Sequence, residues 1–306
     1  MSFEFKRKEA VPRALKRIML EEIDQILTAL AGGRRISRDN AIHDARKRIK
    51  KLRAVLRLAG DAVDSKILHQ EDTVFRNVGR ALSDARDAKI LLDTFDQLHE
   101  SKDCDASTAS IQAVRANLVA RRQAALKQQK QHGTDEVVHI LQAAKRRVRK
   151  CTIHGKGFSA LRGGLKKVYR RGREAFANAR YDRDAITLHD WRKRVKDLQL
   201  HTELIKPIWP DVLERFSSKA HELADGLGED HDLFVLRQFL LQESAAFPTP
   251  MDLETLLEAI DDRRRKLQQT AMTLGDRVYS EKPADFIERM ENYWNAWSTG
   301  EVLETG

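Results

Sequence analysis

One basic motif occurs twice in the chain, first as HDARKRIKKL at residues 43–52 and again as HDWRKRVKDL at residues 189–198. Seven of the ten positions are identical at an offset of 146 residues, and the exchange of Ile49 for Val195 is conservative. A match of this length at one fixed distance is the sequence signature of an internal repeat.

Two shorter matches lie on either side of the motif and keep the same order. LSDARD at residues 82–87 parallels LGEDHD at residues 227–232, and LKRI at residues 15–18 parallels LKKV at residues 165–168. Three ordered matches at nearly one offset predict that the chain arose by duplication of a single ancestral unit.

Both halves have the sequence pattern of helices. No proline occurs between Pro12 and Pro207, and proline is the residue least compatible with a helix interior. Apolar residues recur at helical spacing, and we find no convincing alternation typical of a strand. We predict an all-α protein made of two pseudo-twofold-related helical bundles, at residues 1–151 and 157–300. The predicted helices cover about residues 15–30, 37–60, 64–82, 84–100, 106–131, 135–150, 158–179, 184–206, 210–226, 229–246, 251–275 and 283–297.

The composition narrows the class of protein. Hydrophobic residues make up 41% of the 306 residues, which is enough for a packed core. The two cysteines, Cys104 and Cys151, exclude a disulfide scaffold and a cysteine-rich zinc module. No apolar run has the length of a signal peptide or a membrane span. We expect a soluble cytoplasmic protein with no membrane partner.

The charge is segregated along the chain. The net charge is +10, and its distribution is +9 for residues 1–60, −2 for 61–140, +13 for 141–200 and −10 for 201–306. A solvated surface normally mixes positive and negative residues, so this segregation needs an explanation. Chance clustering is one explanation, and binding of an anionic partner is the other. The doubled basic block predicts an anionic partner.

A helical wheel at 100° per residue gathers the cations of the first motif into a stripe about 120° wide. The apolar residues Ile49 and Leu52 fall on the adjoining face. The second copy behaves in the same way, with Val195 and Leu198 pointing to the core, but Gln199 replaces Arg53. We take as candidate binding residues His43, Arg46, Lys47, Lys50, Arg53 and Arg57 in the first copy and His189, Arg192, Lys193 and Lys196 in the second.

The helix before each motif is basic on one side as well. Its candidate binding residues are Arg13 and Arg17 in the first half and Arg162, Lys166, Arg170 and Arg173 in the second. Cations stacked at one-turn intervals repel one another unless they are solvated or neutralised. A solvated helix face is the alternative to a binding site. We predict instead that both stripes face one continuous basic groove. Two like-charged faces come together only if an anionic ligand compensates their repulsion.

The residue types of the stripes suit a polymeric phosphate. Arginine holds phosphate oxygens through two parallel hydrogen bonds, and lysine adds point charges. Proteins that read bases interleave aromatic residues for stacking, whereas Trp191 falls on the apolar face and Tyr169 is isolated. The pattern therefore favours inorganic polyphosphate over nucleic acid, which stays open as a partner.

The two motif histidines have several interpretations. Four roles are open for His43 and His189: a structural role, a contact to phosphate, titration as a pH switch and metal binding. The acidic run at residues 229–232 is interpreted as a solvated turn or a helix N-cap, with binding of a cation as the alternative. We assign no metal ligands, no cofactor and no catalytic residues, because no nucleophile arrangement, paired carboxylates, Walker loop or dinucleotide fingerprint stands out.

These residues resemble the CHAD family, the conserved-histidine α-helical domain. The resemblance rests on the H-x-x-R-K-x-x-K pattern in both copies and on Arg86-Asp87, matched by His231-Asp232. It implies two helical bundles around a basic channel that binds inorganic polyphosphate, and association with polyphosphate granules. Some members carry a triphosphate-tunnel domain, whose E-x-E-x-K signature we do not find. The resemblance thus implies a standalone, non-enzymatic binding module.

Two other functions remain as hypotheses beside polyphosphate binding. One is a metal-dependent phosphohydrolase that uses His43, His189 and nearby acids on polyphosphate. The other is a helical protein that binds nucleic acid through its backbone phosphates. Phosphate release in the presence of divalent metal would identify the first, and competition with duplex DNA would identify the second.

Overall fold

The computed structural model confirms the prediction of an all-α fold. It describes residues 3–31, 38–100, 107–131, 134–244 and 250–300. Within these ranges there are α-helices, two short 3-10 helices and one isolated antiparallel bridge between Val63 and Ile153, but no strand. No helix in the described ranges presents an apolar stretch sufficient to cross a bilayer.

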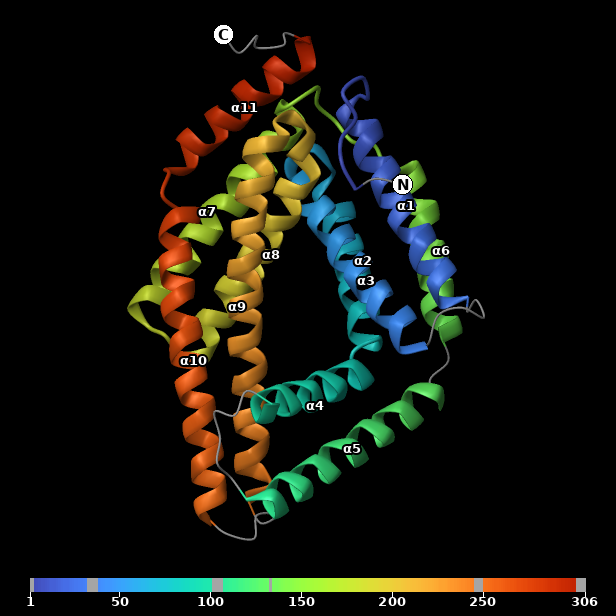
Figure 1. Ribbon diagram of the computed structural model, residues 1–306. Helices are drawn as coiled ribbons and strands as arrows, with labels where there is room; N and C mark the ends of the chain where they lie inside the picture. Colours follow the sequence, from blue (N-terminus) through green and yellow to red (C-terminus); the bar gives the residue numbers. More distant parts are fainter. Residues whose placement is uncertain (1–2, 32–37, 101–106, 132–133, 245–249, 301–306) are drawn as a thin grey trace.

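The helices follow the predicted ranges closely in the first half (Figure 1). They are α1 (Val11–Leu30), α2 (Arg38–Ala59), α3 (Ser65–Ala81), α4 (Asp84–Glu100), α5 (Thr108–Gln131) and α6 (Thr134–Lys150). The second half comprises α7 (Ser159–Tyr181), α8 (Ala185–Ile205), α9 (Pro210–Gln242), α10 (Pro250–Val278) and α11 (Pro283–Thr299). The 3-10 helices are Gly60–Ala62 and Lys206–Ile208.

The packing of the helices repeats between the two halves. The pairs α1 with α2, α1 with α6, α2 with α3 and α4 with α5 pack together in the first half. The second half contains the corresponding pairs α7 with α8, α7 with α11, α8 with α9 and α9 with α10. The same helix pairs therefore pack together in both halves, as expected after a duplication. The duplication itself stays a prediction.

One difference between the halves corrects the sequence prediction. The expected helices 210–226 and 229–246 form the single helix α9, whereas their counterparts α3 and α4 are separate. Gly226 and Gly228 suggested a break, but glycine inside a helix costs only about 1 kcal/mol relative to alanine. Packing of α9 against α8 and α10 stabilises the continuous helix.

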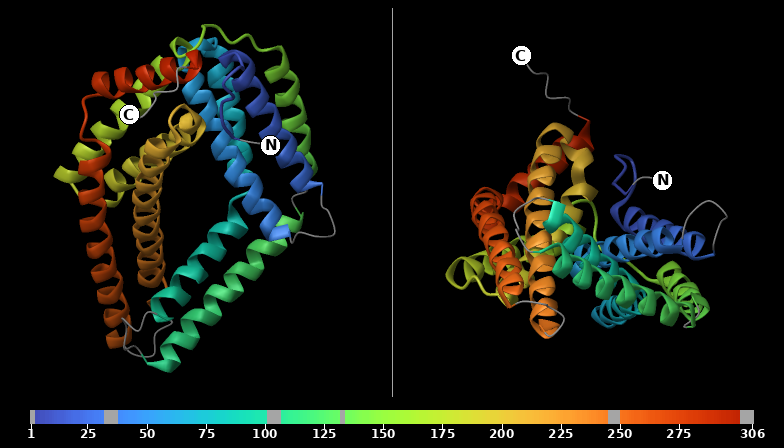
Figure 2. Two further views of the ribbon diagram at one scale, coloured as in Figure 1. Left: turned by 45° about the horizontal axis from the view of Figure 1, so that its top comes forward. Right: turned by 60° about the horizontal axis from the view of Figure 1, so that its bottom comes forward.

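The helices outline a ring that is held together by two hydrophobic cores (Figures 1 and 2). The larger core includes residues of α1, α2, α3, α6, α7, α8 and α11, the first part of α9 and the end of α10. The smaller core joins α4 and α5 to the second part of α9 and the first part of α10. On α9, Leu227 belongs to the first core and Leu233 to the second. The residues between them therefore lie between the two cores.

The two halves approach each other closely where α2 crosses α7 at a glycine. A Cβ atom on Gly164 would lie 2.1 Å from the carbonyl oxygen of Leu58 and 2.6 Å from that of Arg57. Only glycine allows the two backbones to come this close without displacement. This contact fixes the position of α2, which carries the first basic motif, relative to the second half.

Candidate functional site

The two motif helices, α2 and α8, pack against each other, and α8 also packs along α9. Ile49 and Leu52 of α2 are buried, as are Val195 and Leu198 of α8. The helical wheel predicted this burial. The opposite sides of the helices are consequently free for their charged residues.

Lys50 brings the two copies of the motif into one site. Its pKa is lowered to about 8, first by burial and then by the positive charges of Arg192, Arg46, Lys196 and Arg86. Arg192 and Lys196 come from the second copy. The Lys50 side chain is nevertheless exposed to solvent.

We call the charged groups around Lys50 the cationic cluster. It draws on α2, α4 and α8, and its members are Arg46, Lys47, Lys50, Arg86, Arg192, Lys193 and Lys196. Arg86 lies on α4 between Leu82 of the larger core and Leu91 of the smaller one. The cluster is thus located where α4 and α9 pass from one core to the other.

Five carboxylates accompany the seven cations, and two of them, Asp44 and Asp190, act on His43 and His189. Asp87 accepts from Arg46 at 3.4 Å, and Asp225 accepts from Lys196 at 2.9 Å. Asp232 lies within the electrostatic reach of Arg192, Lys50 and Arg86, but burial raises its pKa overall. Among the described residues, no hydrogen bond or ion pair is found for the cluster members Lys47, Lys50, Arg86, Arg192 and Lys193. These five cations are available to an anionic ligand.

Two stacked histidines adjoin the cluster. The rings of His189 and His231 lie 4.3 Å apart between centroids, at 28°. Burial and then the neighbouring cations lower the pKa of His189, and burial followed by His189 lowers the pKa of His231 to about 4. The pKa of His43 is also lowered, by burial first and by Arg86 next. All three histidines are therefore harder to protonate than a free histidine, and their ring nitrogens face the cations of the cluster as possible hydrogen-bonding groups.

Arg53 and Arg57, the last two candidates on α2, form ion pairs within the protein. Arg53 donates two hydrogen bonds to Asp72, at 2.9 and 3.2 Å. Arg57 bridges Asp72 at 3.1 Å and Asp197 of the second half at 2.7 Å. Burial alone would raise the pKa of Asp72, but the two arginines lower it overall. Asp197, which replaces the lysine of the first motif, thus joins the two halves.

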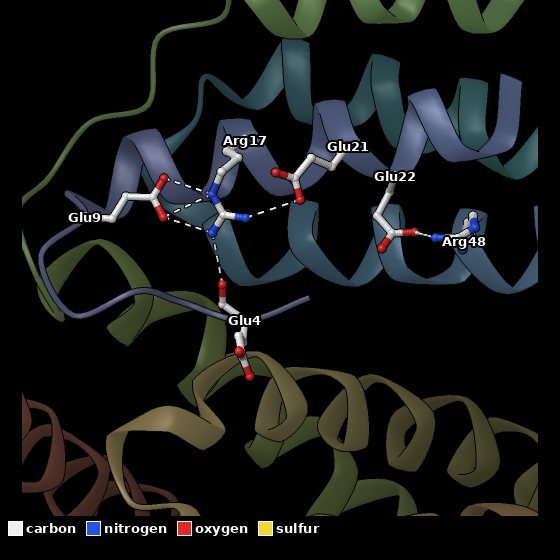
Figure 3. A network of polar contacts seen from close by, with 6 residues as sticks. All are labelled: Glu4, Glu9, Arg17, Glu21, Glu22 and Arg48. Carbon is white, nitrogen blue, oxygen red and sulfur yellow. Dashed lines mark hydrogen bonds and ion pairs between the residues drawn. The ribbon is translucent and has the colours of Figure 1, made fainter. Parts of the chain in front are cut away.

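The candidates on α1 lie away from the cationic cluster. Arg17 donates to Glu9 at 2.9 Å, to Glu21 at 3.3 Å and to the backbone carbonyl of Glu4 at 3.0 Å (Figure 3). Arg13 is exposed on the same helix. Neither is among the charges that chiefly shift the pKa values of the cluster, so the geometry assigns Arg17 to the packing of the N-terminal segment.

The four candidates on α7 are exposed on a different surface. Arg162 forms an ion pair with Glu291 of α11, and Arg170 lies 3.6 Å from Glu174 one turn away. Arg173 acts on the pKa of Tyr169, whose hydroxyl donates to the carbonyl of Val278. Of the four, Arg162 reaches α11, Arg170 faces the next turn of α7 and Arg173 acts within α7, and none is among the charges that chiefly shift the pKa values of the cationic cluster.

Three residues of the site were absent from the candidates derived from the sequence. They are Arg86, His231 and Asp232, and all three belong to the second repeat match, at residues 82–87 and 227–232. The repeat match at residues 82–87 and 227–232 could have identified these three residues, because it accompanies the basic motif in both halves of the chain.

The acidic run at residues 229–232 is neither a turn nor an N-cap, which corrects the sequence interpretation. It lies inside α9. Glu229 pairs with Arg263 at 2.7 Å, and the buried Asp230 accepts from Arg264 at 3.1 Å and from Gln268 at 2.8 Å. Within the described part of the chain, no group of three or more His, Cys, Asp or Glu side chains is arranged to hold a metal ion.

Comparison with known proteins gives a family match and a related solved structure. The sequence profile of the CHAD domain matches residues 17–241. The structure of PptA from Streptomyces chartreusis is similar, with a TM-score of 0.60 at 12% sequence identity, and the similarity covers 87% of this chain and 98% of that one. At this identity the likeness concerns the fold alone. No curated protein matches the sequence significantly.

Proposed function

Because the profile covers well over half of its length, the chain belongs to the CHAD family, and from this premise we propose that it binds inorganic polyphosphate in the cationic cluster without hydrolysing it. The observation that carries the proposal is the effect of Arg192 and Lys196 on the pKa of Lys50. Cations from both motif copies meet there, and a bound polyphosphate would neutralise them.

The chemistry of the cluster supports a phosphate ligand. Arg86 and Arg192 supply planar guanidinium groups, which bind phosphate oxygens through paired hydrogen bonds. Lys47, Lys50 and Lys193 supply ammonium groups on exposed side chains. The seven cations exceed the five carboxylates, so a polyanion would relieve repulsion that the protein alone leaves uncompensated.

The two motif helices, α2 and α8, carry no exposed aromatic residue in the described structure, which favours polyphosphate over nucleic acid. Trp191 and Tyr169 are both fully buried. Neither is available to stack on an exposed base, which is the usual device for binding single strands. A ligand that consists of phosphate alone needs only the cations.

Binding is expected to weaken steeply as the salt concentration rises, because each neutralised phosphate releases a condensed counterion. The measurement is titration calorimetry with long-chain polyphosphate at several salt concentrations. Duplex DNA as a competitor tests the nucleic-acid alternative, and phosphate release with magnesium or manganese tests the hydrolase. Salt-independent affinity, preference for DNA or sustained phosphate release would each contradict the proposal.

The pH dependence of binding is expected to identify Lys50. Free Lys50 loses its proton above its pKa of about 8, whereas a bound polyphosphate raises that pKa by favouring the charged form. Affinity should therefore be steady up to pH 7.5 and fall by about tenfold at pH 9. The K50R variant stays charged over this range and should keep its affinity. Parallel pH profiles for the two proteins would exclude Lys50 from the site.

Association with polyphosphate granules follows as a further part of the proposal. A fluorescent fusion of the protein is expected to colocalise with granules in cells that store polyphosphate. The variant with two reversed charges described in the Discussion should be diffuse under the same conditions.

A further inference from the structure

Arg192 has a central place in the cationic cluster, although no hydrogen bond or ion pair within the described ranges holds it there. After burial, its charge is the strongest influence on the pKa values of Lys50 and Asp232. Its Nε atom is buried and has no hydrogen-bond partner in this part of the chain. Something other than a polar contact must therefore set the position of the Arg192 guanidinium group.

The equivalent arginine of the first motif copy is held by hydrogen bonds. Arg46 donates to the backbone carbonyl of Gly79 on α3 at 3.2 Å, and it pairs with Asp87 on α4 at 3.4 Å. These two contacts tie the Arg46 guanidinium group to the neighbouring helices. The two copies of the motif therefore place their arginines by different means.

The backbone of α9 lies directly against the Arg192 side chain at Gly228. A Cβ atom on Gly228 would be 3.3 Å from the Arg192 Nε atom and 3.4 Å from the terminal nitrogen Nη2. Non-bonded heavy atoms attract best at about 3.5–4.0 Å and repel at shorter distances. The guanidinium group therefore already occupies the space that a side chain at position 228 would need.

We propose that Gly228 is a positioning residue for phosphate binding: the absence of a side chain there lets the Arg192 guanidinium group lie against α9 and present its terminal nitrogens to the ligand. The inference rests on the proposed function and deepens it, because it names the residue that places one of the phosphate-binding arginines. Gly228 acts only through Arg192 and does not itself bind the phosphate.

Helix α9 is held in place on both sides of Gly228. Leu227 is buried in the larger core, and the buried Asp230 accepts a hydrogen bond from Arg264 of α10 at 3.1 Å. The end of an arginine side chain, by contrast, can rotate about several bonds. A methyl group at position 228 would therefore displace the Arg192 guanidinium group by a few tenths of an ångström and leave the helix where it is.

The test is the G228A variant, with G226A as its matched control. Both substitutions add one methyl group to the same helix, but at Gly226 an added Cβ atom meets nothing within 4 Å. Affinity for long-chain polyphosphate is measured by calorimetry for the wild-type protein and both variants. We expect G228A to bind about fivefold more weakly, which is part of the factor of about ten or more that a charged hydrogen bond contributes. G226A should bind as the wild-type protein does.

A second pair of variants tests whether Gly228 acts through Arg192. R192A removes the guanidinium group and is expected to weaken binding by about tenfold or more. The addition of G228A to R192A should then cause no further loss, because the methyl group has no guanidinium group to displace. A glycine that serves only the packing of α8 against α9 would give the same loss in both backgrounds and would also lower the midpoint of thermal unfolding.

The Nε–H group of Arg192 gives a direct readout of the displacement. Because this nitrogen is buried, its proton exchanges slowly with water and gives a nitrogen–proton correlation signal in NMR spectra. The loss of the signal in R192A assigns it. We expect G228A to shift this signal in the protein without ligand, and G226A to leave it unchanged.

Three results would overturn the inference while the proposed function stands. They are wild-type affinity in G228A, an equal loss of affinity when G228A is added to R192A, and an Arg192 signal that G228A does not shift. Absence of polyphosphate binding by the wild-type protein would instead overturn the proposed function, and the role of Gly228 in it. The two failures are distinguishable, because the inference fails alone only when the wild-type protein binds.

Discussion

Reversal of two charges in the cationic cluster, K50E together with K193E, is expected to weaken polyphosphate binding by about a hundredfold or more. A hydrogen bond to a charged group contributes about 1.5–3 kcal/mol, and two such contacts are lost. Both lysines are exposed and lack ion pairs among the described residues, so their reversal breaks no contact that holds the fold. Affinity is measured by calorimetry at one fixed salt concentration.

The matched control is K156E together with K167E, which changes the net charge by the same amount. These lysines are exposed and lie outside the cluster, on α7 and in the segment that precedes it. At physiological salt, charges more than about 8 Å away are largely screened, so the control should lose less than about threefold. Circular dichroism and thermal unfolding must show that both variants fold. Equal losses of polyphosphate affinity in both variants would show that the protein attracts polyphosphate only through its net charge. The cationic cluster would then not be a binding site.

A helical wheel predicts which face a residue occupies but not which partner it meets. At 100° per residue, Arg48 and Lys51 fall away from the centre of the stripe on α2. In the structure Arg48 pairs with the buried Glu22 at 3.0 Å (Figure 3), and Lys51 pairs with Glu203. Reversal of these two charges would break contacts between helices, and a loss of binding would then have two causes. Such partners are far apart in sequence, so spacing along one helix does not reveal them.

The fold was predictable because it depends on local patterns. Periodic apolar residues and the absence of proline gave the helices, and the two prolines near residue 207 marked the boundary of α9. The predicted break at Gly226 and Gly228 was wrong because tertiary packing compensates for a weak local signal. Gly228 approaches Arg192, where an added Cβ would lie 3.3 Å from the Arg192 Nε.

The site was predictable only in part, for a geometric reason. A wheel identifies which face of α2 or α8 is polar, because the apolar face must be buried. It does not say toward which other helix a polar face points. The cations of α2 and α8 meet at Lys50, whereas on α7 Arg162 pairs with Glu291 of α11 and Arg170 faces Glu174 of its own helix. Arg53 and Arg57 belong to the predicted face but are neutralised by Asp72 and Asp197.

Substitution of Gly164 by alanine is expected to destabilise the protein by about 3 kcal/mol, the upper end of the usual cost of overpacking. The new methyl group would lie 2.1 Å from the carbonyl oxygen of Leu58, and a backbone atom of a helix cannot rotate away as a side chain can. Helix α2 must therefore move relative to α7. Urea denaturation measures the change in the free energy of unfolding.

Two other glycine substitutions serve as controls for G164A. In G163A the nearest atom is the Asp61 Oδ2 at 3.0 Å, which belongs to a side chain that can move. In G226A the methyl group meets nothing within 4 Å, and the gain in helix propensity should stabilise α9 by about 0.5–1 kcal/mol. If G164A unfolds at the same urea concentration as G163A, the crossing is not tight. If G164A is destabilised as expected but remains folded, polyphosphate affinity should fall as well, because the same crossing sets the distance between Lys50 and Arg192.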